Sequence, residues 1–189
     1  MDSKSNIKAM EEQLLIERLR DAATCRAAFA EVIAMYSEPL YRQIRRMVVG
    51  HDDAADLLQN TILKAWQNIE NFKGAAKLST WLHKIAINES LSFLERERRR
   101  QAASIDDEES NLINAIAADE WMDGDELTRK LRMAIATLPE KQRLVFNMRY
   151  YDEMKYEQIS EILGTSVGAL KASYHLAEKK IKDFFDNND

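Results

Sequence analysis

One face of a segment near the C-terminus carries small and basic side chains at the spacing of an α-helix. Its outward positions, in order, are Gly168, Lys171, Ala172, His175, Lys179 and Lys182. Small residues let a helix approach base edges closely, and lysines pair with phosphates or guanine acceptors, so this face suits the major groove of DNA. The opposite positions are apolar at intervals of three and four, which predicts one buried stripe: Val167, Leu170, Tyr174, Ala177 and Ile181.

A second helix precedes this one at a distance that leaves room only for a tight turn. The apolar pattern predicts a helix from Tyr156 to Leu163. Gly164 supplies the positive φ that ends it, and Ser166 can cap the next helix by accepting a backbone N–H. Two helices joined in this way are typical of a helix-turn-helix, whose second helix lies in the major groove. The alternative is a helical hairpin with a solvated basic face.

Histidine and cysteine, which often act in catalysis or bind metals, are too few and too scattered in this sequence to form a site. The three histidines (His51, His83 and His175) lie far apart in the sequence, and Cys25 is the one cysteine. There is no glycine-rich phosphate loop and no spacing typical of metal ligands. We therefore expect no enzyme activity, no metal, no cofactor and no small-molecule substrate. The lone cysteine, with no signal peptide and no membrane-length apolar run, predicts a soluble, cytoplasmic protein.

The composition favours an all-α fold of two small helical domains. The 189 residues include only 5 glycines and 2 prolines, and 46% are apolar. The net charge of −5 is unevenly distributed, since nine of the 32 acidic residues and no lysine or arginine lie between 101 and 128. The rest of the chain is mildly basic, as a DNA-binding surface requires. We expect an N-terminal helical domain at 1–100, an acidic linker at 101–125 and a C-terminal helix-turn-helix domain at 126–189.

The N-terminal half predicts several helices, each with a polar and an apolar face. After a frayed start at 1–10, helices are expected at 11–20, 25–35 and 40–49, with Pro39 opening the third. The following helix begins near Asp52, where acidic residues suit its positive N-terminal dipole. Its apolar side is predicted to be buried through Leu58, Ile62, Ala65, Trp66 and Ile69. A long helix at 80–100 follows, with Ser79 as its cap.

Four stretches, spaced along nearly the whole chain, resemble a bacterial RNA polymerase sigma factor of the extracytoplasmic-function (ECF) class. They are DAADLLQNTILKAW (53–66), STWLHKIAINESLSFL (79–94), LPEKQRLVF (138–146) and SEILGTSVGALKASYH (160–175). The last stretch alone is shared by many regulators, whereas the first two, placed before an acidic linker, are specific. The resemblance implies a factor that binds core RNA polymerase and directs promoter recognition and melting.

The resemblance also assigns roles to individual residues. The outward face of the helix after Asp52 is implied to dock on core polymerase through Asp56, Gln59, Asn60 and Lys64. The long helix and the loop before it are implied to read and open the minus-ten promoter element, which requires aromatic side chains for unstacked bases and cations for the backbone. The candidates are Phe72, Lys77, Trp81, Lys84 and Asn88.

The helix-turn-helix is implied to read the minus-thirty-five element. The residues that match the reading face are Ser166, Gly168, Ala169, Lys171, Ala172, Ser173 and His175. The family further implies promoter DNA as a partner and a membrane-anchored anti-sigma factor as an inhibitor. Two other classes remain as alternatives: a stand-alone helix-turn-helix regulator, which would carry a sensory N-terminal domain typically built with strands, and a helical adaptor indifferent to DNA and polymerase.

Overall fold

The computed structural model describes residues 3–48, 50–72, 74, 76–101 and 126–187. Within those residues it contains helices and no strand, which confirms the all-α prediction. The helices are α1 (Ser3–Arg20), α2 (Cys25–Val48), α3 (His51–Asn68), the short 3-10 helix η1 (Ile69–Asn71), α4 (Leu78–Gln101), α6 (Glu126–Ala136), α7 (Glu140–Tyr150), α8 (Tyr156–Leu163) and α9 (Val167–Asn187). Apart from Gln101, which ends α4, the expected acidic linker lies outside the described residues.

The first two helices are longer than the sequence predicted. Helix α1 begins at Ser3, so the expectation of a frayed start at 1–10 is wrong from that residue onward. Helix α2 runs unbroken through Pro39, where we expected one helix to end and another to open. Proline removes one helical hydrogen bond, which destabilises a helix. Because the unbroken helix keeps Val32 and Leu40 buried on either side of the exposed Pro39, core packing outweighs the loss of that hydrogen bond.

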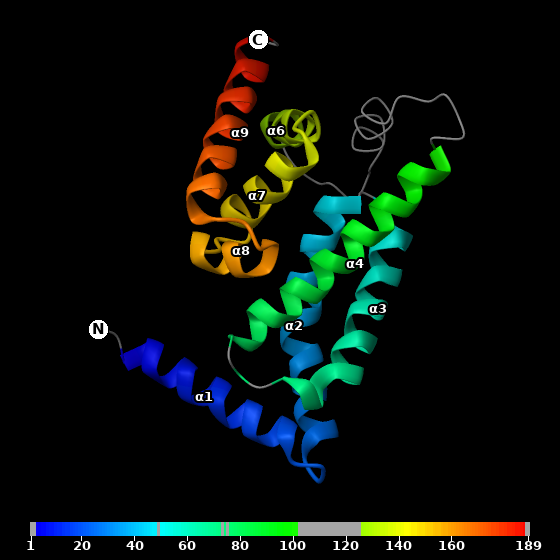
Figure 1. Cartoon of the computed structure of the whole chain (residues 1–189), viewed down its shortest axis with the longest axis vertical. Coiled ribbons are helices and arrows are strands. Elements are labelled where there is room, and N and C mark those ends of the chain that lie inside the picture. The colour runs from blue at the N-terminus through cyan, green and yellow to red at the C-terminus, as the bar shows by residue number, and fades with distance from the viewer. Residues whose placement is uncertain (1–2, 49, 73, 75, 102–125, 188–189) are drawn as a thin grey trace.

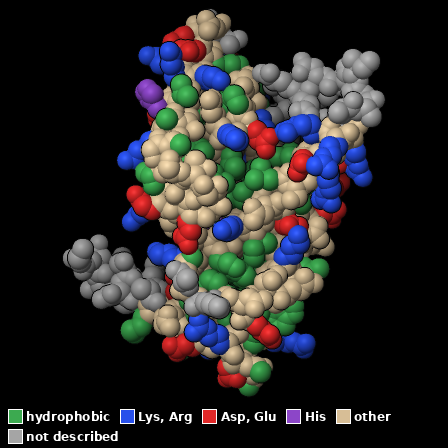
Figure 2. All heavy atoms as spheres, viewed as in Figure 1, with side chains coloured by type: hydrophobic (Ala, Val, Ile, Leu, Met, Phe, Trp, Pro, Cys, Tyr) green, Lys and Arg blue, Asp and Glu red, His purple; other side chains and the backbone are tan. Residues whose placement is uncertain are grey.

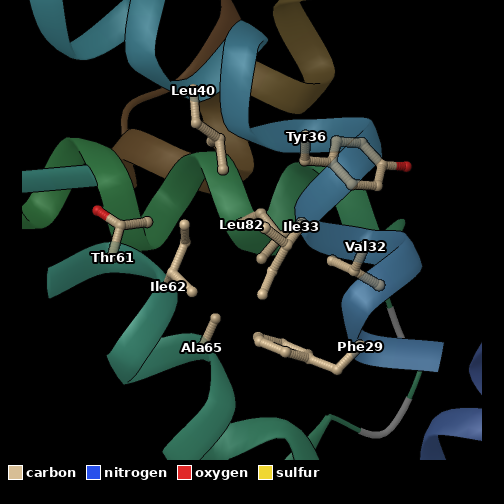
Figure 3. A pocket seen from close by; sticks show the side chains of 9 residues that line it. All are labelled: Phe29, Val32, Ile33, Tyr36, Leu40, Thr61, Ile62, Ala65 and Leu82. Atoms are coloured by element: carbon tan, nitrogen blue, oxygen red, sulfur yellow. The ribbon is translucent and has the colours of Figure 1, made fainter. Parts of the chain in front are cut away.

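Helices α2, α3 and α4 pack side by side into the N-terminal bundle, with α1 beneath them (Figure 1). The seam between α2 and α3 is apolar and almost filled, leaving a cavity of about 10 Å³, which is about the space of one water. Figure 3 shows the residues that line it: Phe29, Val32, Ile33, Tyr36 and Leu40 from α2, Thr61, Ile62 and Ala65 from α3, and Leu82 from α4. The bundle is therefore held by packing, and its function must lie on outward faces.

The start of α4 is held by a residue of α1. The helix begins at Leu78, two residues before the predicted start, so Ser79 lies inside its first turn and is not its cap. The Leu78 backbone N–H instead donates to Glu12 Oε1 at 2.8 Å. A carboxylate at this position satisfies an otherwise unpaired N–H and suits the positive end of the helix dipole.

The C-terminal helices form the predicted helix-turn-helix. Helix α8 has the expected bounds, and Gly164 ends it with φ 62°, the left-handed conformation that glycine adopts without strain. Ser166 Oγ accepts a hydrogen bond from the Ala169 N–H at 3.3 Å and so caps α9, as predicted. Leu170, Ala177 and Ile181 of the α9 stripe are buried, while Val167 and Tyr174 are half-buried.

The two groups of helices pack against each other rather than standing apart. Helix α8 contacts α4, and α7 contacts α2 (Figure 1). One continuous apolar core runs from α1 to α4 into this junction, and a second, smaller core joins α6, α7 and α9. In the part of the chain that is described, no helix is long and apolar enough to cross a bilayer.

Candidate functional site

The outward face of α3 presents the four side chains predicted to dock on polymerase. Asp56, Gln59, Asn60 and Lys64 are all exposed, and the Lys64 ammonium pairs with Glu89 of α4. Leu63 lies among them, because positions three and four apart share one helix face, and its side chain is 53% exposed. The face is therefore polar with an apolar centre.

Trp66 lies one turn further along α3 and is more exposed than predicted. We expected it on the buried side, but 39% of it is accessible, and its ring packs 5.0 Å from the ring of Phe29. Phe29 fills the seam beneath it, which leaves the outer part of the indole at the surface. Sequence reasoning placed Trp66 on the buried side because an apolar residue on an amphipathic helix is assigned to the core, and it assigned Leu63 to neither face.

The predicted minus-ten residues fall into two groups. Lys77, Lys84 and Asn88 are exposed at the start and along one side of α4. The aromatic pair lies deeper: Phe72 is only 6% exposed, and its ring centroid is 5.1 Å from that of the half-buried Trp81. Phe72 thus supports Trp81 from the core side. Lys77, Lys84 and Asn88 are therefore accessible to a nucleic-acid backbone, and part of the Trp81 ring is also accessible.

Basic side chains also collect where α4 ends. Arg98, Arg99 and Arg100 occupy its last turn, where positive charge suits the negative end of the helix dipole. Figure 2 shows Lys and Arg side chains gathered in this region, at the upper right. Arg98 reaches across to the start of α7 and pairs with Glu140 at 2.6 Å.

The reading face of α9 is open to solvent. All of its predicted DNA contacts are exposed except Ser173, which is half-buried: Ser166, Gly168, Ala169, Lys171, Ala172 and His175. Lys171 Nζ lies 5.8 Å from the centre of the Tyr156 ring, and the Arg149 guanidinium lies 5.4 Å from the same ring. Two cations therefore flank one tyrosine beside the recognition helix.

Arg149 and Tyr156 line a wide hollow that the sequence did not predict. Its volume is about 530 Å³, and its lining is Arg149, Tyr150, Glu153, Tyr156 and Tyr174. Tyr174 and Phe146 stack at 5.5 Å, and Phe146 stacks in turn on Tyr150 at 5.2 Å, so the two tyrosines of the wall share one aromatic ring beneath them. The run RYYDEMKY (149–156) signals an aromatic cluster, but only the fold shows that Arg149 and Tyr156 adjoin Lys171.

A buried polar cluster lies at the junction of the two groups of helices. His83 Nδ1 lies 2.8 Å from Gln43 Oε1, and Gln43 Nε2 donates to Asp152 Oδ2 at 2.9 Å; Arg46 pairs with the other carboxylate oxygen. Burial, aided by the Arg46 charge, lowers the pKa of His83 to about 4. Burial also raises the pKa of Asp152, although Arg46 and Gln43 oppose the rise. His83 is therefore neutral at pH 7, and its Nδ1–H donates to Gln43.

Nothing in the described residues resembles a metal centre. They contain no group of three or more His, Cys, Asp or Glu side chains able to hold an ion. Cys25 is a free, half-buried thiol. His51 hydrogen-bonds to the Tyr41 hydroxyl at 2.7 Å, so two of the three histidines are engaged in structural contacts.

Each of the two groups of helices matches a known protein family. Residues 32–100 match Sigma-70 region 2, and residues 128–181 match Sigma-70 region 4. The chain is 29% identical over 163 residues to the ECF RNA polymerase sigma factor SigW of Bacillus subtilis, covering 82% of this chain and 87% of that protein. It is 27% identical over 180 residues to the ECF RNA polymerase sigma-E factor of Haemophilus influenzae, covering 91% and 94%.

Solved structures share the fold at low sequence identity. The structure of CnrH in complex with the cytosolic domain of CnrY is similar with a TM-score of 0.68 at 20% identity, covering 94% of this chain and 99% of that one. The sigma factor RpoE in complex with the anti-sigma factor NepR, from Bartonella quintana, is similar with a TM-score of 0.63 at 20% identity, covering 84% and 96%.

Proposed function

Because the chain belongs to the ECF class of RNA polymerase sigma factors, we propose that its two domains have separate roles in promoter recognition. The N-terminal domain (1–100) docks on core polymerase and opens the minus-ten element. The C-terminal domain (126–189) reads the minus-thirty-five element. The observation that carries this division is the order of the two family matches, region 2 at 32–100 and region 4 at 128–181. Sigma factors are not a family of enzymes, and the work proposed is binding without covalent chemistry.

The outer face of α3 is the proposed docking surface. Asp56, Gln59, Asn60 and Lys64 supply hydrogen bonds and charge, and the exposed Leu63 supplies an apolar centre. Interfaces are stabilised most by a desolvated apolar centre within a polar rim, so this composition supports a protein partner rather than mere solvation.

Helix α4 is the proposed minus-ten reader. Lys77 and Lys84 are placed to neutralise backbone phosphates, and Asn88 to hydrogen-bond a base edge or sugar. Trp81 stacks on an unpaired base, with Phe72 acting behind it as a positioning residue. The 5.1 Å contact between these two rings supports this arrangement, because a supported ring loses little freedom when a base stacks on it.

Helix α9 is the proposed minus-thirty-five reader. Lys171 contacts a phosphate or a guanine, and the small Gly168 and Ala172 allow the helix to lie close to the bases. The residues Ser166, Ala169, Ser173 and His175 complete the face. Arg149 is added as a phosphate contact, because its guanidinium and Lys171 flank the same tyrosine.

A further partner proposed for the chain is an anti-sigma factor anchored in the membrane, which would hold the protein inactive in the cytoplasm. The support is that chains of this fold have been solved with the anti-sigma factor NepR and with the cytosolic domain of CnrY. Affinity capture from separated membrane and soluble fractions tests the anchoring. A partner recovered from detergent-solubilised membranes is expected, and recovery from the soluble fraction alone contradicts it.

The proposed division of labour is tested by run-off transcription. The purified chain and bacterial core polymerase are incubated with a library of DNA fragments, and new start sites are mapped. We expect initiation that depends on the added chain, at sites that share two separated sequence elements. Start sites that share only one element would contradict the proposal that both domains read DNA.

A further inference from the structure

The hollow beside the recognition helix is large enough to hold a small molecule. Its volume of about 530 Å³ lies within the usual range of ligand sites in proteins. Arg149 and Tyr150 of its lining come from α7, Glu153 from the turn after α7, Tyr156 from α8 and Tyr174 from α9. Of these residues only Arg149 has a part in the proposed reading of DNA, so the other four side chains have no role yet.

The apolar part of the lining is aromatic and suits a flat ring. Phe146 stacks on both Tyr150 and Tyr174, at interplanar angles of 18° and 12°, so it covers one face of each tyrosine. Tyr150 is nevertheless 50% exposed. Tyr156 lies edge-on to Tyr174, with ring centroids 6.3 Å apart. Tyrosine rings from three helices therefore border one hollow, where a planar ring system can stack on an exposed ring.

Two side chains of opposite charge line the same hollow without pairing with each other. Arg149 Nη1 donates to the Met154 carbonyl at 3.1 Å, which fixes the guanidinium and leaves its other N–H groups for a ligand. The Glu153 side chain is exposed and has no ion-pair or hydrogen-bond partner among the described residues. The hollow thus offers a forked donor at one point of its lining and a carboxylate acceptor at another.

Glu153 is held in a backbone conformation that glycine would adopt at less cost. Its φ is 51°, in the left-handed region, and within the described part of the chain no other residue except glycine has a positive φ. The turn is fixed by the next residue, Met154, whose N–H donates to the Met148 carbonyl at 3.0 Å. Strained residues of this kind cluster at ligand sites. A carboxylate that stands where glycine fits better therefore supports a binding role for it.

We propose that this hollow is a binding site for a guanine nucleotide. The base stacks on the tyrosine rings, Glu153 accepts hydrogen bonds from guanine, and the Arg149 guanidinium binds a phosphate. Guanine fits because the edge of its ring carries two neighbouring donors, N1–H and the 2-amino group, which one carboxylate can accept together and which adenine lacks. Guanidinium and phosphate match in both charge and geometry. This site goes beyond the proposed function, because the proposed reading of DNA does not require it.

The site has a consequence for DNA, because Arg149 is also the proposed contact to a promoter phosphate. A guanidinium that holds the phosphate of a nucleotide is not available to the DNA backbone. Lys171 of the recognition helix flanks the same Tyr156 ring, so the nucleotide lies close to the reading face. A bound guanine nucleotide should therefore weaken contact with the minus-thirty-five element. This consequence, unlike the site itself, rests on the proposed function.

Equilibrium dialysis of the full chain against radiolabelled GDP tests the site. Three further probes each lack one part of the ligand: ADP lacks the paired donors of the guanine edge, guanosine lacks the phosphates, and inorganic pyrophosphate lacks the ring. We expect saturable binding of one GDP per chain. The affinity for each of the other probes should be weaker by about tenfold or more, because a site built around a polar group rejects an analogue that lacks it.

Variants assign the binding to the hollow. Glu153→Gln should weaken GDP binding about tenfold, because an amide cannot accept from both guanine donors. The matched control is Glu157→Gln, an exposed glutamate in the first turn of α8 that does not line the hollow, and it should bind GDP like the unmodified chain. Glu153→Gly should also weaken binding but should not lower the urea midpoint, because glycine adopts this φ without strain. The glycine variant thus separates lost binding from lost folding.

Several outcomes would overturn the proposal. Absence of saturable GDP binding removes the site altogether. Equal affinity for ADP or for guanosine contradicts the assignment to a guanine nucleotide, and equal affinity for pyrophosphate reduces the binding to attraction between charges. Unchanged GDP binding by Glu153→Gln, or an equal loss in Glu157→Gln, shows that the nucleotide does not bind in this hollow.

The consequence for DNA is tested by electrophoretic mobility shift of a promoter found by run-off mapping, with core polymerase and the chain, in the presence and absence of saturating GDP. GDP should reduce the promoter complex of the unmodified chain and leave that of Glu153→Gln unchanged. An equal reduction with both chains would mean that GDP acts on polymerase, which contradicts competition at Arg149. Absence of any promoter complex before GDP is added would contradict the proposed function instead, while dialysis still decides whether the site exists.

Discussion

Gln43 and Asp152 share a hydrogen bond of 2.9 Å although 109 residues separate them in the chain. Gln43 belongs to α2 and Asp152 to the turn after α7, so the bond joins the parts of the chain that match regions 2 and 4. The same Gln43 accepts a hydrogen bond from His83 of α4. Three segments that are distant in sequence therefore meet at one buried amide.

The first prediction concerns the docking face of α3. Asp56→Arg combined with Gln59→Ala should abolish co-purification with core polymerase without unfolding the chain, because both side chains are exposed. The matched control is Asp183→Arg, the same charge reversal near the end of α9. Retained binding by the α3 variant would remove this face from the interface.

The second prediction concerns Lys171. Lys171→Ala should lower promoter use about tenfold, since one specific base contact contributes on the order of 1–3 kcal/mol. The loss should be confined to promoters with an intact upstream element. Transcript yield is compared on intact templates and on templates with that element scrambled; an equal loss on both would mean that Lys171 does not read it.

The third prediction concerns the exposed residues of α4. Lys84→Ala and Asn88→Ala should each reduce the fraction of competitor-resistant open complexes, because they remove contacts to the melted strand. Affinity for core polymerase should be unchanged, since neither residue lies on the outer face of α3. An equal loss of polymerase affinity would assign these residues to docking instead.

Much of the fold was predictable because its signals are local. Gly164, Ser166 and the α9 stripe lie within one supersecondary unit, and each agreed with the structure. The continuity of α2 through Pro39 was not predictable, because burial of Leu40 and its neighbours by other helices decides it. The pairing of Gln43 with Asp152 has no sequence signal, since nothing local specifies a partner so distant in the chain.

The candidate site was predictable only in its polar part. Exposed residues such as Lys84 and Lys171 stand on faces that the helical period identifies. Trp66 was expected to be buried because an apolar residue is assigned to the core by default, and Arg149 was missed because its neighbour Lys171 comes from another helix.

The fourth prediction concerns the cap of α4. Glu12→Ala should lower the free energy of unfolding by about 1 kcal/mol, the usual cost of losing a helix cap, because the Leu78 N–H loses its carboxylate partner. Urea unfolding measures the change. Glu11→Ala is the matched control, and an equal effect of both variants would show that Glu12 acts only through general surface charge.

The fifth prediction concerns the pH dependence of stability. Because His83 has a folded-state pKa of about 4, below its unfolded value of 6.5, the unfolded chain binds more protons in this range. Stability should fall as pH falls from 6.5 to 4, by an amount on the order of 3 kcal/mol in total.

The raised pKa of Asp152 acts in the opposite sense: the folded chain takes up its proton more readily, so that contribution favours folding as pH falls. The contribution of His83 to the pH dependence of the unfolding free energy can be isolated with His83→Gln, because glutamine does not titrate in this range. Unfolding free energies of both proteins are compared from pH 7 to pH 4. If the unfolding free energy of His83→Gln changes with pH as steeply as that of the unmodified chain, another group causes the pH dependence.

Permanganate footprinting of a promoter found by run-off mapping tests the central claim most directly, because it detects unpaired thymines. The account predicts reactive thymines at the minus-ten element when the chain and core polymerase are both present, and none with either one alone. DNA bound by the chain, with no reactive thymine when polymerase is added, would contradict the account and indicate a regulator that binds DNA without opening it.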